Sequence, residues 1–287
     1  MKRFLFLSAL VLSLARAEDR PLRVVTLNTV LTEIAREVGG AQVSVNGLVK
    51  PDVDPHSFDP SASDIRALAE ADVVLASGLS LESYLDRIAS NTGKARVLKI
   101  GDALPSVLST GGSEPDPHWW NSIDNVLFAS ELVRAEYARL RPSSATEFAR
   151  NAQAYRRRLL ALKTEIAREI DTLPPEKRHL VTSHDAFGYF ARDYGFTVHA
   201  ISGLSTDSEP DARHLATLID LIRRKHIKAV FAESSVNSKL IANLVRETGV
   251  RLGGTLYADG LGVAGGDAAT YEAMVRLNAR TIVESLR

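Results

Sequence analysis

The sequence predicts an α/β protein with two β/α lobes, whose mainly parallel sheets are joined by one long rigid helix. Short β-rich runs alternate with helical patterns in both halves of the chain, an order typical of parallel sheets with helices on both faces. Between the halves, residues 144–171 contain no Gly or Pro and carry an apolar residue every three or four positions, which indicates an amphipathic helix. At about 1.5 Å per residue, this helix would be longer than one small domain needs.

The long helix sets the predicted domain boundaries. Ser144 and Glu147 form a capping-box pattern, which predicts that the helix begins there. We therefore assign residues 18–140 to an N-terminal lobe, 141–172 to the linking helix and 173–287 to a C-terminal lobe. No Gly-rich linker flanks the helix, so the lobes should be held rather than loosely tethered.

In the N-terminal lobe, β-rich runs predict four strands and helical periodicity predicts four helices. Gly39 and Gly40 end the first helix, and Ser61 with Asp64 caps the second. The predicted strands lie at 22–28, 43–49, 72–77 and 96–100, the helices at 29–38, 62–71, 81–89 and 121–140, and a Gly/Pro/Ser-rich loop at 102–117.

The C-terminal lobe shows the same alternation of strands and helices with a different sequence. Because ligands bind outside the carboxyl ends of the strands in open α/β sheets, the residues that follow each strand are the first to inspect. The predicted strands lie at 179–183, 196–201, 228–233 and 251–258, and the helices at 186–194, 211–225, 237–247 and from about 268 onward.

The first 17 residues have the pattern of a cleavable secretory signal peptide. Lys2 and Arg3 precede an apolar run at 4–14, and Ala-Arg-Ala at 15–17 matches a small-x-small cleavage site. The run is too short to span a membrane. Cleavage would reduce the 35 basic side chains to 32 against 35 acidic ones, a net charge of −3. This balance does not favour nucleic acid or an anionic membrane surface as a partner.

The chain contains no cysteine. This excludes disulfides, thiolate metal ligands and a cysteine nucleophile, and it also excludes a lipid-bearing cysteine after the signal peptide. We therefore expect a protein that diffuses freely outside the cytoplasm, most simply in a bacterial periplasm, without a lipid anchor.

Four side chains at strand ends or loop positions are candidate metal ligands: His56, His118, His184 and Asp259. A proline precedes each of the first two and restrains the backbone there. Three imidazoles and one carboxylate would satisfy a four-coordinate divalent cation such as Zn²⁺. With all four bound, no open position remains, which favours a carrier site. The alternative is that loop histidines are solvated or cap helices, which better fits His179, His199, His214 and His226.

Several segments resemble one family in the right order along the chain. They are DPHSFDPSASDIRALAEADVVLASGLSLE, DPHWWNS, TSHDAFGYFARDYGF, GLSTDSEPDARHL and the DGLG that follows a strand. The chain is similar over nearly its whole mature length to the zinc/manganese substrate-binding proteins of ABC transporters that have a rigid inter-domain helix. The resemblance implies two lobes with the metal in the cleft between them, and ligands at His56, His118, His184 and Asp259. It also implies an ABC permease at the inner membrane as partner; a zinc metallochaperone is a further candidate, and we expect a monomer.

The third ligand position indicates which metal is carried. Family members that take manganese or iron resemble this chain but place Glu where His184 stands. A third imidazole favours Zn²⁺, because Mn²⁺ prefers more oxygen ligands. We therefore predict a protein that captures Zn²⁺ for import, with a manganese carrier as the alternative.

Two features depart from the family pattern. Many zinc-specific relatives carry a long His-rich loop before the second ligand, whereas residues 102–117 are short and contain no His, so we expect no zinc-gathering role for this loop. Residues 231–235 (FAESS) match a family segment that usually reads Glu-Pro-Gln. Glu233 is a candidate to orient a ligand imidazole, or it is an ordinary carboxylate at a strand end.

Two further motifs and a catalytic arrangement in the sequence do not favour another function. The GxGxxG at 260–265 lacks the βαβ unit and the later acidic residue of a dinucleotide site. The adjacent residues Ser183, His184 and Asp185 cannot form a catalytic relay, because consecutive extended residues point to opposite faces. A zinc hydrolase using three imidazoles, a bound water and Glu233 as base would need an open fourth position. We predict that the protein is not an enzyme.

Overall fold

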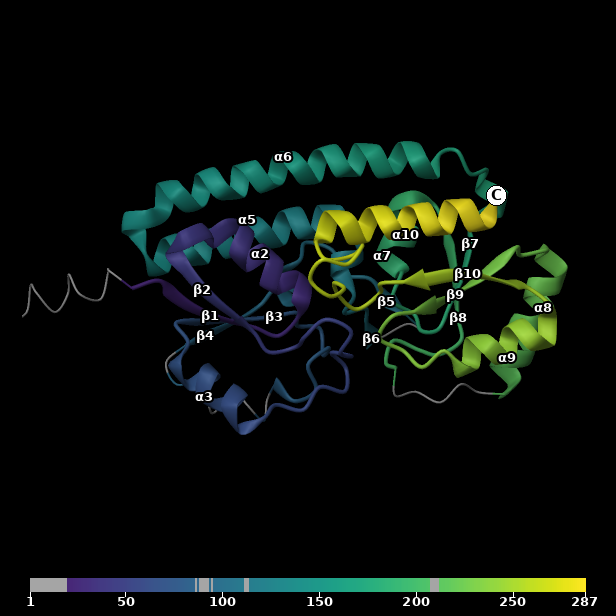
Figure 1. The fold of residues 1–287 in the computed structure, drawn as a ribbon, viewed down its shortest axis with the longest axis horizontal. Helices are drawn as coiled ribbons and strands as arrows, with labels where there is room; N and C mark the ends of the chain where they lie inside the picture. Colours follow the sequence, from purple (N-terminus) through teal and green to yellow (C-terminus); the bar gives the residue numbers. More distant parts are fainter. Residues whose placement is uncertain (1–19, 86, 88–92, 94, 111–113, 207–211) are drawn as a thin grey trace, which may run out of the picture.

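The computed structural model describes residues 20–85, 87, 93, 95–110, 114–206 and 212–287. Within these residues, two α/β lobes lie next to each other beneath the long helix α6 (Figure 1). We call the part before this helix the N lobe and the part after it the C lobe. The signal peptide predicted at 1–17 lies outside the described residues, as do residues 86, 88 and 89 of the helix predicted at 81–89.

The N lobe contains a four-stranded sheet in which every pairing is parallel, with the order β2-β1-β3-β4. Alternate residues of the central strands face two different cores. Val24 and Leu75 pack on the side of the long helices, whereas Val25 and Val74 pack on the side of α3. The elements are β1 Leu22–Thr26, α2 Thr29–Gly39, β2 Val43–Gly47, α3 Ala62–Glu70, β3 Val73–Ala76, β4 Arg96–Lys99 and α5 Ile123–Leu140.

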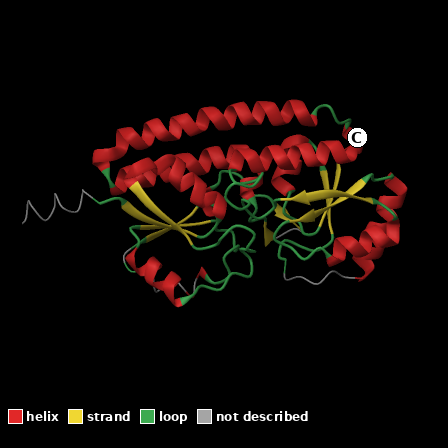
Figure 2. Cartoon of the chain, viewed as in Figure 1, coloured by secondary structure: helices red, strands yellow, loops and turns green. Residues whose placement is uncertain are grey.

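The C lobe contains two parallel strand pairs, β7-β8 and β9-β10, and β7 lies next to β9. Helices lie above and below the strands of both lobes (Figure 2). The elements are β7 His179–Thr182, α7 Gly188–Tyr194, β8 Thr197–Ala200, α8 Ala212–Lys225, β9 Ala229–Glu233, α9 Lys239–Thr248, β10 Arg251–Leu256 and α10 Tyr271–Leu286. The predicted α/β class with mainly parallel sheets is thus confirmed.

The long helix α6, Ala145–Ile170, packs against both lobes. It contacts α2 and α5 in the N lobe and α10 in the C lobe. Arg158, near its middle, binds one acidic side chain of each lobe: Nη2 lies 2.6 Å from Glu37 Oε2 on α2, and Nε lies 2.8 Å from Glu272 Oε1 on α10. The apolar stripe that predicted the helix is buried along its whole length, at Phe148, Ala152, Tyr155, Leu159, Leu162, Ile166 and Ile170.

The capping box predicted at the start of α6 is wrong. Ser144 has φ −102° and ψ 6°, so it lacks the extended backbone with which an N-cap hydroxyl reaches the first turn. Its Oγ donates instead to Gln42 Oε1 at 3.1 Å, while Gln42 Nε2 donates to Glu147 Oε2 at 3.0 Å. Both predicted capping residues therefore bind the N lobe. The box predicted at Ser61 is present, with both reciprocal bonds to Asp64.

Three further details differ from the predicted elements. The loop at 102–117 contains a short antiparallel pair, β5 Ser109–Thr110 with β6 Glu114–Pro115. A 3-10 turn at Trp119–Asn121 precedes α5, and α10 begins only at Tyr271, where the Thr270 side chain caps it. Among the described residues, no helix combines the length and the hydropathy needed to cross a bilayer.

Two adjacent leucines of α6 test its orientation. Leu159 is fully buried, whereas Leu160 is 41% exposed. Leu159→Ala should lower the free energy of unfolding by about 2–5 kcal/mol, because it removes packed methyl groups and leaves a cavity. Leu160→Ala should change it by less than about 0.5 kcal/mol. Denaturant titration followed by circular dichroism measures both, and equal losses would contradict the packing of α6.

Candidate metal centre

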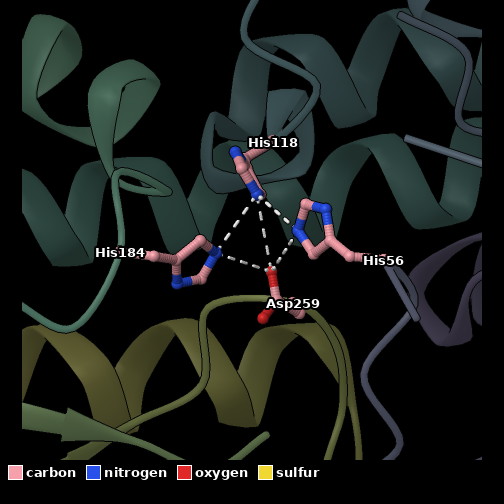
Figure 3. A group of neighbouring side chains, drawn as sticks. All are labelled: His56, His118, His184 and Asp259. Carbon is pink, nitrogen blue, oxygen red and sulfur yellow. Dashed lines mark hydrogen bonds and ion pairs between the residues drawn. The ribbon is translucent and has the colours of Figure 1, made fainter. Parts of the chain in front are cut away.

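The four side chains singled out in the sequence meet at one point between the lobes (Figure 3). His56 lies in the loop after β2, His118 precedes the 3-10 turn before α5, His184 follows β7, and Asp259 follows β10. One ligand atom from each lies within 4.8 Å of all the others, and none of the four residues is more than 9% exposed. In the described part of the chain, this is the one group of three or more potential ligands so arranged.

The distances between these atoms are those of the edges of a tetrahedron. His118 Nε2 lies 3.2 Å from His56 Nε2 and 3.3 Å from His184 Nε2. Asp259 Oδ1 lies 3.6, 3.5 and 3.2 Å from the Nε2 atoms of His56, His118 and His184. A tetrahedral cation with ligands at about 2.0–2.1 Å would hold them roughly 3.3 Å apart. Asp259 Oδ1 is buried and accepts no hydrogen bond, as expected of an atom that faces a cation.

Two of the imidazoles have a carboxylate behind them. Asp116 Oδ1 accepts hydrogen bonds from the backbone N and the Nδ1 of His118, both at 2.9 Å. Glu233 Oε2 accepts from His184 Nδ1, and its Oε1 accepts from the backbone N–H groups of Ser183 and His184 at 2.9 and 3.1 Å. A proton held on Nδ1 leaves the Nε2 lone pair free to face the centre, which is how metal-binding histidines are usually oriented.

Sequence reasoning does not single out Asp116, although a signal exists in the repeated tripeptide Asp-Pro-His. Asp54 makes the same backbone bond as Asp116, accepting from His56 N at 2.8 Å. Its other oxygen does not reach the imidazole but accepts from Thr206 Oγ1 of the C lobe at 2.5 Å. The two tripeptides therefore have the same local turn and different tertiary partners. Residues of both lobes, Asp54 and Thr206 among them, line a cavity of about 360 Å³ beside His184.

The carboxylate ligand is held by residues of both lobes. Ser235 Oγ donates to Asp259 Oδ2 at 2.7 Å, and Asn28 Nδ2 donates to the Asp259 carbonyl at 3.1 Å. A Cβ on the next residue, Gly260, would lie 2.3 Å from Thr29 Oγ1. The first glycine of the GxGxxG pattern is therefore required by close packing against the start of α2.

Burial and the nearby opposite charges shift the pKa values of the candidate ligands in opposite directions. Burial lowers the pKa of His118, and the nearby His184 lowers it further. The hydrogen bond and charge of Asp116 act in the opposite direction but do not outweigh burial. Burial also disfavours the charged form of His184, but Asp259 and Glu233 together raise its pKa well above the ordinary value. The same imidazoles hold the pKa of Asp259 well below its usual range despite burial. Because an imidazole must be neutral at the nitrogen that binds a metal, protons compete with a cation at this centre.

Three of the four remaining histidines have side-chain partners outside this centre. His179 Nδ1 lies 3.1 Å from His199 Nε2, with the two rings stacked, and His214 Nε2 donates to the Ala200 carbonyl at 2.7 Å. The paired tryptophans are fully buried: Trp119 Nε1 donates to the Ser77 carbonyl and Trp120 Nε1 to the Ala258 carbonyl. They pack the region around the centre, and neither indole ring is exposed as a surface on which a sugar or a base could stack.

Comparison with known proteins agrees with this fold and centre. The sequence pattern of the family described as "Zinc-uptake complex component A periplasmic" matches residues 24–285. The manganese-binding lipoprotein MntA of Bacillus subtilis is 38% identical over 284 residues, which are 96% of this chain and 93% of the relative. The zinc-binding protein TroA of Treponema pallidum is 35% identical over 280 residues, covering 95% and 91%. The solved structure of that periplasmic protein has a TM-score of 0.89 and covers 93% of this chain and 99% of its own.

The two-lobed fold, with a buried cluster of potential metal ligands between the lobes, is that of a metal-binding substrate-binding protein of an ABC transporter. The chain belongs to the family of the periplasmic component A of the zinc-uptake complex. The resemblance found in the sequence is confirmed. Such proteins work with a membrane permease and its ATPase, and they act as solute carriers rather than as enzymes.

The two lobes offer a matched test of the carboxylate behind His184. Glu233 and Glu82 are both buried and each accepts hydrogen bonds from two successive backbone N–H groups, Glu82 from Ser77 and Gly78. Only Glu233 also binds a candidate ligand. Glu233→Gln should weaken metal affinity by about 10–100-fold, the usual cost of losing such a partner, whereas Glu82→Gln should leave it unchanged. Calorimetric titration with Zn²⁺ measures both, and equal affinities in the two variants would contradict the role of Glu233.

Proposed function

We propose that this chain captures Zn²⁺ at His56, His118, His184 and Asp259 and delivers it to an ABC permease for import. The observation that carries the proposal is the imidazole of His184 at the third ligand position. It makes the donor set three nitrogens and one oxygen, spaced at 3.2–3.6 Å along the five edges given above. Zn²⁺ accepts four such ligands in a tetrahedron, whereas Mn²⁺ prefers more oxygen ligands and a higher coordination number.

The names of the relatives favour different metals. The family name and TroA refer to zinc, whereas MntA, which is 38% identical to this chain, is named for manganese. A manganese carrier is therefore the second candidate. The donor set favours zinc, because a site for Mn²⁺ would need further oxygen ligands at a centre where the four side chains are at most 9% exposed.

The same geometry favours a carrier over a zinc hydrolase. A hydrolytic site keeps one position open for water, with three protein ligands. Here Asp259 Oδ1 lies 3.2–3.6 Å from the three imidazole Nε2 atoms, close to the 3.2 and 3.3 Å between imidazoles, and it fills the fourth position. Glu233 is directed at His184 Nδ1, on the far side of the ring from the centre.

The competing metals can be compared directly in one experiment. The protein is stripped with a chelator, offered equimolar Zn²⁺ and Mn²⁺, and analysed by mass spectrometry. We expect one bound Zn²⁺ and no Mn²⁺ in the wild type, a shift towards Mn²⁺ in His184→Glu, and weaker zinc retention in Asp259→Ala. Retention of Mn²⁺ by the wild type would contradict the choice of metal. Binding of neither metal would contradict the site itself.

We further propose that residues 1–17 are removed on export, and that the mature protein is a monomer in the periplasm which a zinc metallochaperone can also supply. In the mature chain, residues 18–140 and 173–287 would form the lobes and 141–172 the link. MntA is named a lipoprotein, but the 287 residues of this chain contain no cysteine to carry a lipid.

Cell fractionation tests this location. In a Gram-negative host that expresses the full chain, the protein should appear in the fluid released by osmotic shock, and its N-terminus should be Glu18. As a control, a variant with Cys in place of Glu18 and a lipoprotein signal peptide should stay with the membranes. Recovery of the unaltered chain in the membrane fraction would contradict a freely diffusing form.

A further inference from the structure

One amide side chain, Asn121, connects three of the four segments that carry the candidate ligands. Its backbone N–H donates to the His118 carbonyl at 3.1 Å, which closes the 3-10 turn after that ligand. Its Nδ2 donates to the Ala186 carbonyl at 2.9 Å and to the Ala258 carbonyl at 3.1 Å. Ala186 lies two residues after His184, and Ala258 directly precedes Asp259. Both N–H donors of the amide are thus used on the C lobe.

The connections between these bonds and the ligands are short. The N–H of Ala186 donates to the His184 carbonyl at 3.1 Å, so the carbonyl that Asn121 holds belongs to the turn that carries this ligand. The Ala258 carbonyl also accepts from Trp120 Nε1 at 2.8 Å. Asn121 is 8% exposed, so water does not readily replace its bonds. Because the amide group is planar and its two N–H directions are fixed, it sets the separation of two carbonyls in the segments that follow β7 and β10 of the C lobe.

We propose that Asn121 is a positioning residue that sets the spacing of His118, His184 and Asp259 and thereby favours a small tetrahedral cation. This rests on the proposed function of the centre. The three edges among these ligands are 3.3, 3.5 and 3.2 Å. A cation that needs six ligands requires this triangle to open and admit further donors. Holding all three segments to one rigid group opposes such opening, while His56 reaches the centre from a separate loop.

Donation to two carbonyl oxygens at once explains why residue 121 is an asparagine. An Asp is the same size but would direct oxygens at two carbonyl oxygens, and a Ser offers a single donor. Only an amide supplies two donors from one short side chain.

Asn125 provides a matched control. It lies one turn further on, in α5, is 7% exposed, and its Nδ2 donates to the Trp119 carbonyl at 3.1 Å. Substitution of either residue by Ala removes a buried amide of the same region, but the amide of Asn125 binds only within the segment of His118 and does not reach the C-lobe segments that carry His184 and Asp259. Thermal unfolding of the metal-free variants shows whether the two substitutions cost similar stability.

The test measures coordination geometry and metal preference together. Wild type, Asn121→Ala and Asn125→Ala are loaded with Co²⁺, whose visible absorption is intense in a tetrahedral site and weak in a six-coordinate one, and are titrated with Zn²⁺ and Mn²⁺. We expect Asn121→Ala to lose most of the intense absorption and about 10–100-fold in Zn²⁺ affinity, with a smaller change for Mn²⁺. Asn125→Ala should match the wild type. The isosteric Asn121→Asp is measured in the same way and should behave like Asn121→Ala, including when the alanine variant does not fold.

Each other outcome has a definite meaning. A wild-type spectrum and an unchanged ratio of Zn²⁺ to Mn²⁺ affinity in Asn121→Ala or Asn121→Asp would overturn the assignment of Asn121. An equal change in Asn125→Ala would overturn it as well, because the effect would then be one of general packing. A wild type that binds none of the three metals would overturn the proposed function, and the assignment with it.

Discussion

The burial of three imidazoles and a carboxylate at one point is the constraint on which the rest of the structure depends. Polar groups removed from water are costly unless each has a partner. For three of the four ligands, a partner lies on the side that faces away from the centre: Asp116 behind His118, Glu233 behind His184 and Ser235 beside Asp259. The atoms that face inward form the candidate metal centre. A rigid scaffold is needed because the four ligands come from segments far apart in the sequence.

That scaffold is supplied by helices that contact both lobes. The helix α6 packs on each lobe, and Arg158 binds an acid from each. The start of α2 also crosses the boundary, since Asn28 binds the Asp259 carbonyl and Thr29 Oγ1 accepts from Leu261 N at 2.8 Å. Through Glu33, α2 further accepts the N–H of Tyr271 at the start of α10. Burial raises the pKa of Glu33 to about 7. The lobes are thus joined close to the candidate metal centre as well as along the long helix α6.

Two kinds of feature could be predicted from the sequence: helices and strands, which depend on neighbouring residues, and candidate ligands, which are recognised by residue type. The stripe of α6 and the four strands of each lobe follow from periodicity, which depends on near neighbours alone. The candidate ligands could be predicted because imidazole and carboxylate groups bind metals, and because ligands of open α/β sheets bind at the carboxyl ends of the strands. The capping box at Ser144 failed because Gln42, a hundred residues earlier, competes for both of its side chains. Asn121 could not be assigned for the same reason, because its role depends on which distant segments fold against it. Asp116 left a local signal in the repeated Asp-Pro-His, but in the first copy Asp54 reaches the His56 backbone and not its ring, so the tripeptide alone does not decide the role. The β5–β6 pair is too short to leave a pattern.

The two Asp-Pro-His tripeptides share one local turn, but only in the first of them does the aspartate side chain bind the opposite lobe. At 116–118 the aspartate directs the same oxygen to the backbone and to the ring of its own histidine, so this ligand is anchored within a single segment. At 54–56 the aspartate joins the His56 backbone to Thr206 on the opposite lobe. A force that separates the lobes is therefore transmitted through Asp54 to the segment that carries His56. The segment of His56 is thus tied to the opposite lobe, whereas His118 is held by an aspartate of its own segment, so the two candidate ligands differ in their dependence on the distance between the lobes.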